Sequence, residues 1–244
     1  MNKADYDKMM QKQIEELGGK RAKLLLHSCC APCSSACLER LKDFFDITVL
    51  YYNPNIEDEE YNLRKSEQTR FLKETGWADI LDCDHDAEKF YGLARGLENV
   101  PEGGARCLKC YELRLERTAE EAEMGGYDYF TTTLTISPQK SSQVLNAIGE
   151  RLAEGKNTKW LYSDFKKRGG YLRSCELARE YSQHGSHFLT PATDKNLRDL
   201  STGSSVGYFY SPIYQITAAI RGGPLCARQI VSVYTLFVRT KIYS

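Results

Sequence analysis

The chain has 244 residues, with 33 Lys or Arg against 33 Asp or Glu, so its formal net charge is zero. A balanced charge gives no overall field that would attract nucleic acid, and any basic surface must be local. Hydrophobic residues make up 41% and charged residues 27% of the chain, as in an ordinary globular protein. No apolar run is long enough for a membrane span, and the polar start has no signal-peptide core. These features predict a cytoplasmic protein that does not enter membranes.

Strands and helices alternate in the expected element order up to residue 182. Apolar or β-rich runs predict strands at 22–28, 47–52, 79–81, 129–134 and 159–162. Periodic or charged segments predict helices at 1–20, after Pro32, and at 57–75, 86–96, 107–123, 139–153 and 171–182. Such alternation predicts right-handed βαβ units and an α/β fold, with a mostly parallel sheet covered by helices on both faces.

The chain is expected to divide into three parts. Residues 1–20 predict a helical extension, and residues 21–182 hold the α/β domain. Residues 183–244 contain only two acids, Asp194 and Asp199, and their apolar residues lose clear helical period. For this last part we expect a small appended unit or a non-native tail, such as a frameshift leaves.

Nine cysteines are many for a chain expected in the cytosol, where they are more often metal ligands or catalytic groups than disulfides. Two groups stand out, because Cys29 and Cys30 follow the first expected strand and Cys107 and Cys110 open a later helix. Four thiols are the number that a tetrahedral zinc ion or a cubane iron–sulfur cluster requires. The spacing leaves both metals open.

Each cysteine group also has a simpler explanation. The positive end of a helix dipole favours thiolates at Cys107 and Cys110, but two core cysteines or a redox pair have the same spacing. A strained vicinal disulfide is the alternative for Cys29 and Cys30, and it would be labile in the cytosol. Cys33 lies one turn further on, where a second metal and simple packing are about equally favoured.

Other polar clusters have ordinary interpretations beside functional ones. Asp82, Asp84, His85 and Asp86 could bind a second metal or supply a general acid, although a solvated turn with a helix cap is favoured. Segment 137–142 fits a phosphate cradle, and helix capping explains its serines equally well. Basic residues that could grip phosphates, or simply face solvent, gather at Arg64, Lys65, Arg70, Lys140, Lys166, Lys167, Arg168 and Arg173.

Four stretches together resemble the cobalamin-independent epoxyqueuosine reductase family. They are residues 27–33, 52–56, 107–115 and 128–134, and they keep the family's order within a match that covers roughly residues 20–182. Members of that family remove the epoxide oxygen from epoxyqueuosine in the anticodon of certain tRNAs, which is the last step in making queuosine. The resemblance therefore implies an oxidoreductase whose partner is tRNA carrying epoxyqueuosine.

The resemblance also implies a metal centre and a fold. A [4Fe-4S] cluster would be held by Cys29, Cys30, Cys107 and Cys110, and a second iron nearby would have Cys33 and an acid such as Asp84 as candidate residues. The fold expected is a Rossmann-like, three-layer fold related to nucleotide α-hydrolases. ATP-using members of that fold carry a Gly-rich loop after the first strand, where this chain has adjacent cysteines, which argues against ATP use. The electrons would come from an external low-potential donor.

One departure from the family pattern bears on activity. The family usually ends with a redox-active Cys-x-Cys motif shortly after the last helix, whereas here the likeness stops at residues 180–182, and Cys175 and Cys226 cannot form that motif. A chain without it would bind its cluster yet turn over poorly. Two other classes stay open, namely a non-catalytic metal-binding protein that binds tRNA and an ATP-dependent tRNA thiolase of the same fold.

Overall fold

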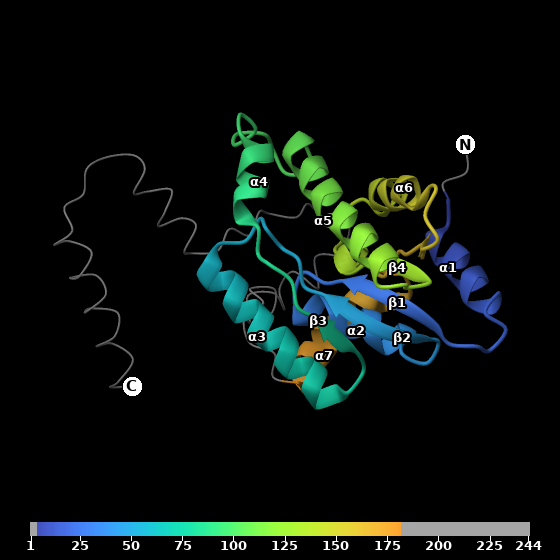
Figure 1. The fold of residues 1–244 in the computed structure, drawn as a ribbon. Coiled ribbons are helices and arrows are strands. Elements are labelled where there is room, and N and C mark those ends of the chain that lie inside the picture. Colours follow the sequence, from blue (N-terminus) through green and yellow to red (C-terminus); the bar gives the residue numbers. More distant parts are fainter. Residues whose placement is uncertain (1–3, 182–244) are drawn as a thin grey trace, which may run out of the picture. The chain divides into compact units, whose positions relative to one another are not determined.

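The structure is a computed structural model that describes residues 4–181 (Figure 1). The expectations for the tail at 183–244, including its missing Cys-x-Cys motif, lie outside the described residues. Five strands form one sheet in the order β3-β2-β1-β4-β5, and every neighbouring pair is parallel. The strands are β1 (Ala22–His27), β2 (Phe45–Leu50), β3 (Asp79–Leu81), β4 (Tyr129–Thr132) and β5 (Lys159–Trp160). The predicted α/β fold with a parallel sheet is confirmed.

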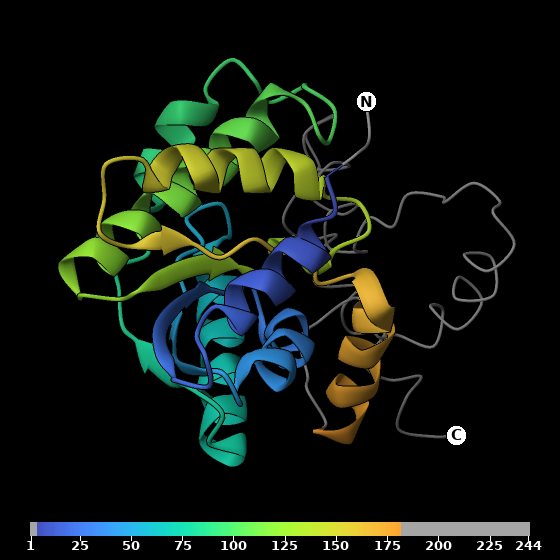
Figure 2. The same ribbon diagram turned by 90° about the vertical axis from the view of Figure 1, so that its right-hand side faces the viewer.

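Helices cover both faces of the sheet, which makes three layers. They are α1 (Tyr6–Glu15), α2 (Ala31–Leu41), α3 (Asp58–Thr75), α4 (Ala87–Ala94), α5 (Ala105–Met124), α6 (Ser142–Ala153) and α7 (Gly170–Glu180), with short 3-10 turns η1 (Thr133–Ile136) and η2 (Lys167–Gly169). Figure 2 shows α5 and α6 on one side of the sheet and α2, α3 and α7 on the other. No helix within residues 4–181 combines the length and the apolar character needed to cross a bilayer.

The alternation of side chains along β1 explains the two hydrophobic cores. Leu24 and Leu26 are fully buried in the core shared with α2 and α7, whereas Leu25 between them is fully buried in the core shared with α5 and α6. A strand buried on both faces reads as a continuous apolar run, which is why residues 22–26 predicted β1 correctly.

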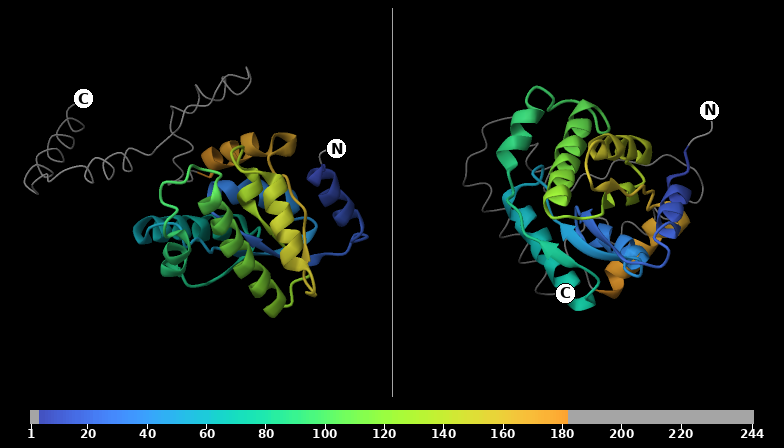
Figure 3. Two further views of the ribbon diagram at one scale, coloured as in Figure 1. Left: turned by 90° about the horizontal axis from the view of Figure 1, so that it is seen from above. Right: turned by 45° about the vertical axis from the view of Figure 1, so that its right-hand side comes forward.

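Helix α1 belongs to the same body as the sheet. Met10 and Ile14 join the core on the α2 side. The Gln13 amide donates to the carbonyl of Trp160 at 2.9 Å and accepts from the Tyr162 N–H at 2.9 Å, which ties α1 to the end of β5. Figure 3 shows α1 at one side of the sheet. Residues 6–15 therefore form part of the α/β core.

Several element ends differ from the prediction for local reasons. Strand β2 ends at Leu50, so Tyr51 and Tyr52 lie beyond the strand at its carboxyl end. Strand β4 gives way to η1 because the Thr132 hydroxyl accepts from the Leu134 N–H at 3.1 Å and turns the backbone. Helix α6 begins at residue 142, later than predicted, because the Ser141 hydroxyl caps it at the Val144 N–H.

The order of the strands creates a switch point between β1 and β4. From β1 the chain reaches β2 through α2 on one face, whereas it enters β4 through α5 on the other face. In open α/β sheets, ligands bind in the crevice that such a reversal leaves outside the carboxyl ends of the strands. Residue Cys29 after β1 and residue Thr133 after β4 stand at that crevice.

Candidate functional site

Three thiols lie together where β1 passes into α2. The Sγ atoms of Cys29, Cys30 and Cys33 are all within 4.8 Å of one another, and that of Cys30 is 4.0 Å from Cys29 and 2.8 Å from Cys33. Cys30 is the N-cap of α2 with an extended backbone, and Pro32 follows in the first turn, where its missing N–H is not needed. Within residues 4–181, no other set of three Cys, His, Asp or Glu side chains converges in this way.

Polar contacts from three elements fix this thiol loop. The Ser28 hydroxyl donates to the Gln68 side chain on α3 at 2.7 Å, and the Ser28 N–H donates to the carbonyl of Leu50 at 2.9 Å. On the β4 side, the hydroxyl of Thr133 accepts from the Cys29 N–H at 3.4 Å and lies 3.6 Å from its sulfur. The loop is thus held from β2, α3 and η1, and its thiols lie at the switch point.

Arg114 on α5 connects the thiol loop with the second cysteine pair. Its guanidinium lies 3.9 Å from the Cys110 sulfur and donates to the Asn53 side-chain oxygen at 2.5 Å. The Asn53 amide in turn donates to the carbonyl of Ser28 at 2.9 Å. Cys110, one helical turn before Arg114, therefore lies on the side of α5 that faces the Cys29 loop.

This guanidinium is buried without a carboxylate partner. Arg114 is only 4% exposed, and none of the ion pairs within residues 4–181 includes it. A buried charge is costly unless an opposite charge compensates it. Its guanidinium contacts the Cys110 sulfur, the Asn53 side-chain oxygen and the ring of His27. Of these groups only the thiol can become an anion, so thiolates, alone or bound to a metal, are the anions that this position favours.

The three thiols of this cluster differ in the direction of their pKa shifts. Hydrogen bonds from Cys30 and Cys33 hold the pKa of the Cys29 thiol well below its usual value, and the charges of Arg114 and Lys140 act in the same direction. The same contacts with Cys29 raise the pKa of Cys30 and Cys33. A cluster that favours one thiolate beside two thiols is suited to bind a soft metal ion or to undergo redox chemistry.

His27, the last residue of β1, is a buried histidine that precedes the thiol loop. Its Nδ1 lies 2.8 Å from the Thr132 hydroxyl and its Nε2 lies 3.0 Å from the carbonyl of Tyr52, so the ring joins β1 to β4 and β2. Burial, together with the charge of Arg114, lowers the pKa of His27 to about 3. The ring is therefore uncharged at neutral pH and orients the loop.

Cys107 and Cys110 open α5 as predicted, but they stand outside the group of three thiols. The Cys107 sulfur accepts from the Gly103 N–H at 3.3 Å, and Cys110 is buried against Arg114. The thiol that comes nearest to Cys30 is that of Cys33, for which sequence reasoning had left metal binding and packing equally open. Sequence reasoning missed the roles of Asn53 and Thr133. The spacing of four residues from Cys110 to Arg114 placed positive charge near the cysteine pair, but the burial of that charge was not predicted.

Asp84 and its neighbours form separate pairs. Asp84 is exposed and pairs with Arg117 at 2.9 Å, while His85 bonds to Asp58 at 2.8 Å. Asp86 stands at the N-cap of α4, but it accepts from the Tyr52 hydroxyl at 3.1 Å and does not cap the helix. The favoured interpretation as a turn fits these contacts, whereas the expected side-chain cap of α4 is wrong.

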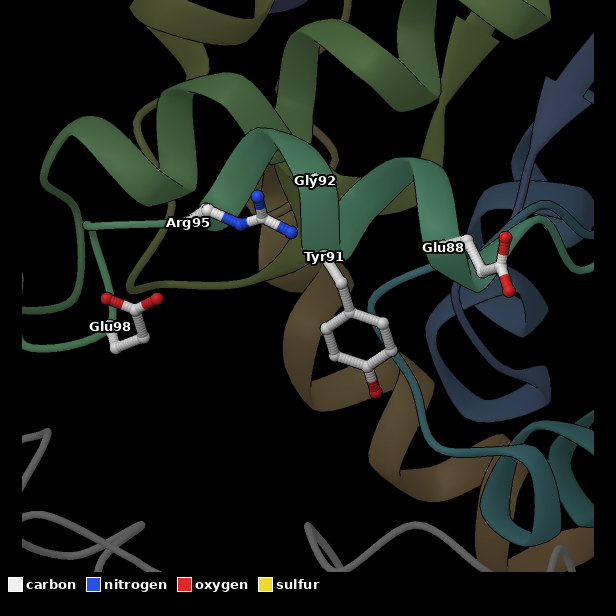
Figure 4. Close-up of a pocket in the computed structure, with 5 residues that line it drawn as sticks. All are labelled: Glu88, Tyr91, Gly92, Arg95 and Glu98. Carbon is white, nitrogen blue, oxygen red and sulfur yellow. The ribbon is translucent and has the colours of Figure 1, made fainter.

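A pocket on the outer side of α4 offers a different environment. It is lined by Glu88, Tyr91, Gly92, Arg95 and Glu98, and Figure 4 shows the Tyr91 and Arg95 side chains between two carboxylates at its ends. It has no thiol and mixed charge, so it provides neither the soft ligands nor the positive field seen at the switch point. The thiols at the switch point are therefore the stronger candidate site.

A parallel α/β fold with a partly buried thiol cluster and an uncompensated guanidinium at its switch point is suited to a protein that uses its thiols for metal binding or redox chemistry. The comparison with known families makes this specific: a family model described as Epoxyqueuosine reductase QueH matches residues 24–187. The chain belongs to the epoxyqueuosine reductase QueH family.

Individual relatives agree with the family match. The chain is 42% identical over 190 residues to a protein of Staphylococcus epidermidis named epoxyqueuosine reductase QueH, covering 74% of this chain and 80% of that one. It is 43% identical over 187 residues to the protein of that name from Streptococcus pyogenes, covering 73% of each chain. A solved NH3-dependent NAD synthetase from Campylobacter jejuni aligns with 85% of this chain and 100% of its own at 13% identity and a TM-score of 0.31, which adds nothing to the fold described above.

Proposed function

We propose that this chain is an epoxyqueuosine reductase that removes the epoxide oxygen from epoxyqueuosine in tRNA. The family match supports the reaction. The cluster of Cys29, Cys30 and Cys33 at the switch point of the sheet is the observation that supports placing the reaction there. Removing an epoxide oxygen as water consumes two electrons and two protons. The electrons would come from an external low-potential donor, and the tRNA would present its modified base to the crevice between β1 and β4.

The residues at the switch point suit a thiolate-ligated iron centre. The donor set is all sulfur, which selects soft or borderline metals and iron–sulfur clusters over Mg²⁺ or Ca²⁺. The buried Arg114 supplies the positive charge that an anionic thiolate centre would need. When bound, an iron–sulfur cluster supplies single electrons, and an iron with an open position supplies a Lewis acid.

Within this proposal, Cys29, Cys30, Cys107 and Cys110 hold a [4Fe-4S] cluster. The support for combining the two pairs is the path of contacts from Cys110 through Arg114 and Asn53 to Ser28, the residue before Cys29.

A second iron is part of the same proposal. Its ligands would be Cys33, whose sulfur already lies among those of Cys29 and Cys30, and an acid such as Asp84, which would have to leave its pair with Arg117. This second iron rests on fewer contacts than the cluster.

The chain's own residues would prepare the site for the substrate. Neutral His27 keeps the β1 loop in place without adding a charge, and Thr133 offers a hydroxyl directly at Cys29. Lys140 before α6 places positive charge near Cys29, where phosphates of a tRNA would be attracted, whereas the charge of Arg64 on α3 is paired with Glu60 at 2.6 Å. The local charge compensates for the absence of a basic overall field.

The test is an anaerobic reaction with a defined product. The purified chain is loaded with iron and sulfide, incubated with tRNA bearing epoxyqueuosine and a strong reductant, and the digested nucleosides are weighed. Loss of one oxygen is expected with the wild type and with the Cys175→Ser control, which changes a buried thiol on α7. An intact cluster that leaves epoxyqueuosine unchanged would mean either that the loss of the Cys-x-Cys end has abolished turnover or that the proposed reaction is wrong. Restoring a Cys-x-Cys motif after residue 182 separates these outcomes, and a restored chain that still leaves epoxyqueuosine unchanged refutes the reaction.

A further inference from the structure

Tyr51 carries a buried hydroxyl that no group in the described chain satisfies. The residue is fully buried, and its hydroxyl makes no hydrogen bond to any group within residues 4–181. Buried polar atoms in native proteins nearly always have a partner, and each exception calls for an explanation such as an absent ligand. Two neighbouring tyrosines do not share this property, because the hydroxyl of Tyr52 bonds to Asp86 and that of Tyr61 bonds to the carbonyl of Tyr51.

The position of Tyr51 places its side chain on the α2 and α3 side of the sheet. Along β2, Ile47 and Val49 belong to the core on this side, while Leu50 and Tyr52 belong to the opposite core. Tyr51 comes two residues after Val49 and so points to the same side of the sheet as Ile47 and Val49. Because the Ser28 N–H donates to the carbonyl of Leu50, the residue lies beside the Ser28–Cys29 segment at the carboxyl end of the sheet.

Helix α3 completes the surroundings of this hydroxyl. The ring of Tyr61 lies 5.1 Å from that of Tyr51, and Gln68, two turns later, accepts from the Ser28 hydroxyl in the thiol loop. Arg64 stands between them on the same face of the helix. The side chain of Tyr51 therefore packs against α3, on the face of the sheet where α2 begins at its N-cap Cys30.

The electrostatics agree with this placement. Burial raises the pKa of Tyr51, Arg64 opposes that rise, and Cys29 and Cys30 add to it. The hydroxyl is therefore protonated at neutral pH and lies within the field of the thiols. It is therefore a buried hydrogen-bond donor that has no acceptor among the described residues.

We propose that Tyr51 is a substrate-positioning residue whose hydroxyl donates a hydrogen bond to the epoxide oxygen of the substrate. This inference rests on the proposed function, because it takes the substrate oxygen to lie at the Cys29–Cys30 site. As that oxygen leaves carbon it gains negative charge, and a preorganised donor in a water-poor site stabilises such charge strongly. The bond also distinguishes epoxyqueuosine from queuosine, which lacks that oxygen.

Removing only the hydroxyl separates this role from packing. Tyr51→Phe keeps the ring beside Tyr61, and because the hydroxyl is unsatisfied in the free protein, the variant should keep its melting temperature and its iron and sulfide content. We expect kcat for deoxygenation to fall by about 10²-fold, the scale seen when one oxyanion donor is lost. Tyr129→Phe is the matched control, because Tyr129 is the first residue of β4 at the amino end of the sheet, and its rate should not change.

A binding measurement without reductant tests the same bond without turnover. Wild-type protein should bind epoxyqueuosine tRNA about 3- to 10-fold more tightly than queuosine tRNA, the range expected for one hydrogen bond, and Tyr51→Phe should lose this preference. Equal affinities in the wild type, or a wild-type rate in Tyr51→Phe, would overturn the proposal, as would an altered cluster spectrum in substrate-free Tyr51→Phe. If the preference depends on Tyr51 but no oxygen is removed, the proposed reaction fails and this assignment stands.

Discussion

The sulfur atoms of Cys30 and Cys33 lie 2.8 Å apart across the first turn of α2. This separation is closer to the length of a disulfide, about 2.05 Å, than to an ordinary contact between thiols. The sequence Cys-Ala-Pro-Cys at the start of a helix, directly after a strand, brings these two thiols together, and hydrogen bonds with Cys29 raise the pKa of both. The pair is therefore set either to share a metal centre or to oxidise when no metal is bound.

We predict that the metal-free protein forms a Cys30–Cys33 disulfide when it is treated with oxidised glutathione. The two thiols give up two electrons and two protons, and the glutathione disulfide takes them up as two thiols. Peptide mapping by mass spectrometry should find this bond, and the oxidised protein should fail to take up iron until dithiothreitol is added. Cys33→Ser should resist this block, whereas mapping of a Cys29–Cys30 bond would contradict the prediction.

Replacing a proposed ligand should remove the cluster. Cys29→Ala and Cys110→Ala each delete one thiolate, and we expect both variants to lose most of their iron and sulfide after anaerobic reconstitution. Cys175→Ala also removes a buried thiol but should keep the metal. Iron and acid-labile sulfide are measured per chain, together with the visible absorbance. Full loading of Cys110→Ala would show that α5 supplies no ligand through that residue.

The sequence predicted features that depend on neighbouring residues in the chain, but not those that depend on contacts between distant segments. The apolar run before Cys29, the alternation of elements and the pair at Cys107 and Cys110 are local signals, and they predicted the fold and the candidate ligands. The burial of Arg114 could not be read locally, because it depends on α5 packing over β1 and β2. In the same way, the sequence around Asp84 gave no sign of its pair with Arg117 on α5, which Asp84 would have to leave in order to bind a metal.

Arg114 should contribute more to the thermal stability of the cluster-loaded protein than to that of the metal-free protein. Arg114→Met removes an uncompensated buried charge together with the bond to Asn53, and these two effects oppose each other in the metal-free chain. A bound anionic centre would lose its nearest counter-charge, so the rise in melting temperature on cluster loading should shrink. Arg114→Lys keeps the charge but lacks the planar guanidinium. Its rise in melting temperature on cluster loading should lie between those of the wild type and Arg114→Met. Equal destabilisation of both forms with unchanged iron content would assign Arg114 a purely structural role.

Asp7 should make α1 sensitive to acid. Its carboxylate is 6% exposed and pairs with Arg40 on α2 and, at 2.8 Å, with Arg168. Burial opposes ionisation, but the bonds to Arg40 and Arg168 outweigh it and lower the pKa of Asp7 below its usual value of 3.8. The unfolded chain therefore takes up a proton before the folded chain does. The stabilisation from Asp7 is complete above about pH 4 to 5 and is lost as the pH falls through its folded pKa.

Asp7→Asn tests this dependence. At pH 7 the amide leaves Arg40 and Arg168 without their carboxylate, and we expect the free energy of unfolding to fall by about 1–3 kcal/mol. Urea denaturation of both proteins at a series of pH values should show this difference constant down to about pH 5 and shrinking toward pH 3. Asp128→Asn is a suitable control for an exposed carboxylate, because the Asp128 carboxylate accepts from the Lys23 N–H at the amino end of the sheet and pairs with no Arg or Lys side chain within residues 4–181. A difference that stays constant down to pH 3 would mean that Asp7 stabilises α1 by its shape and hydrogen bonds, without a contribution from its charge.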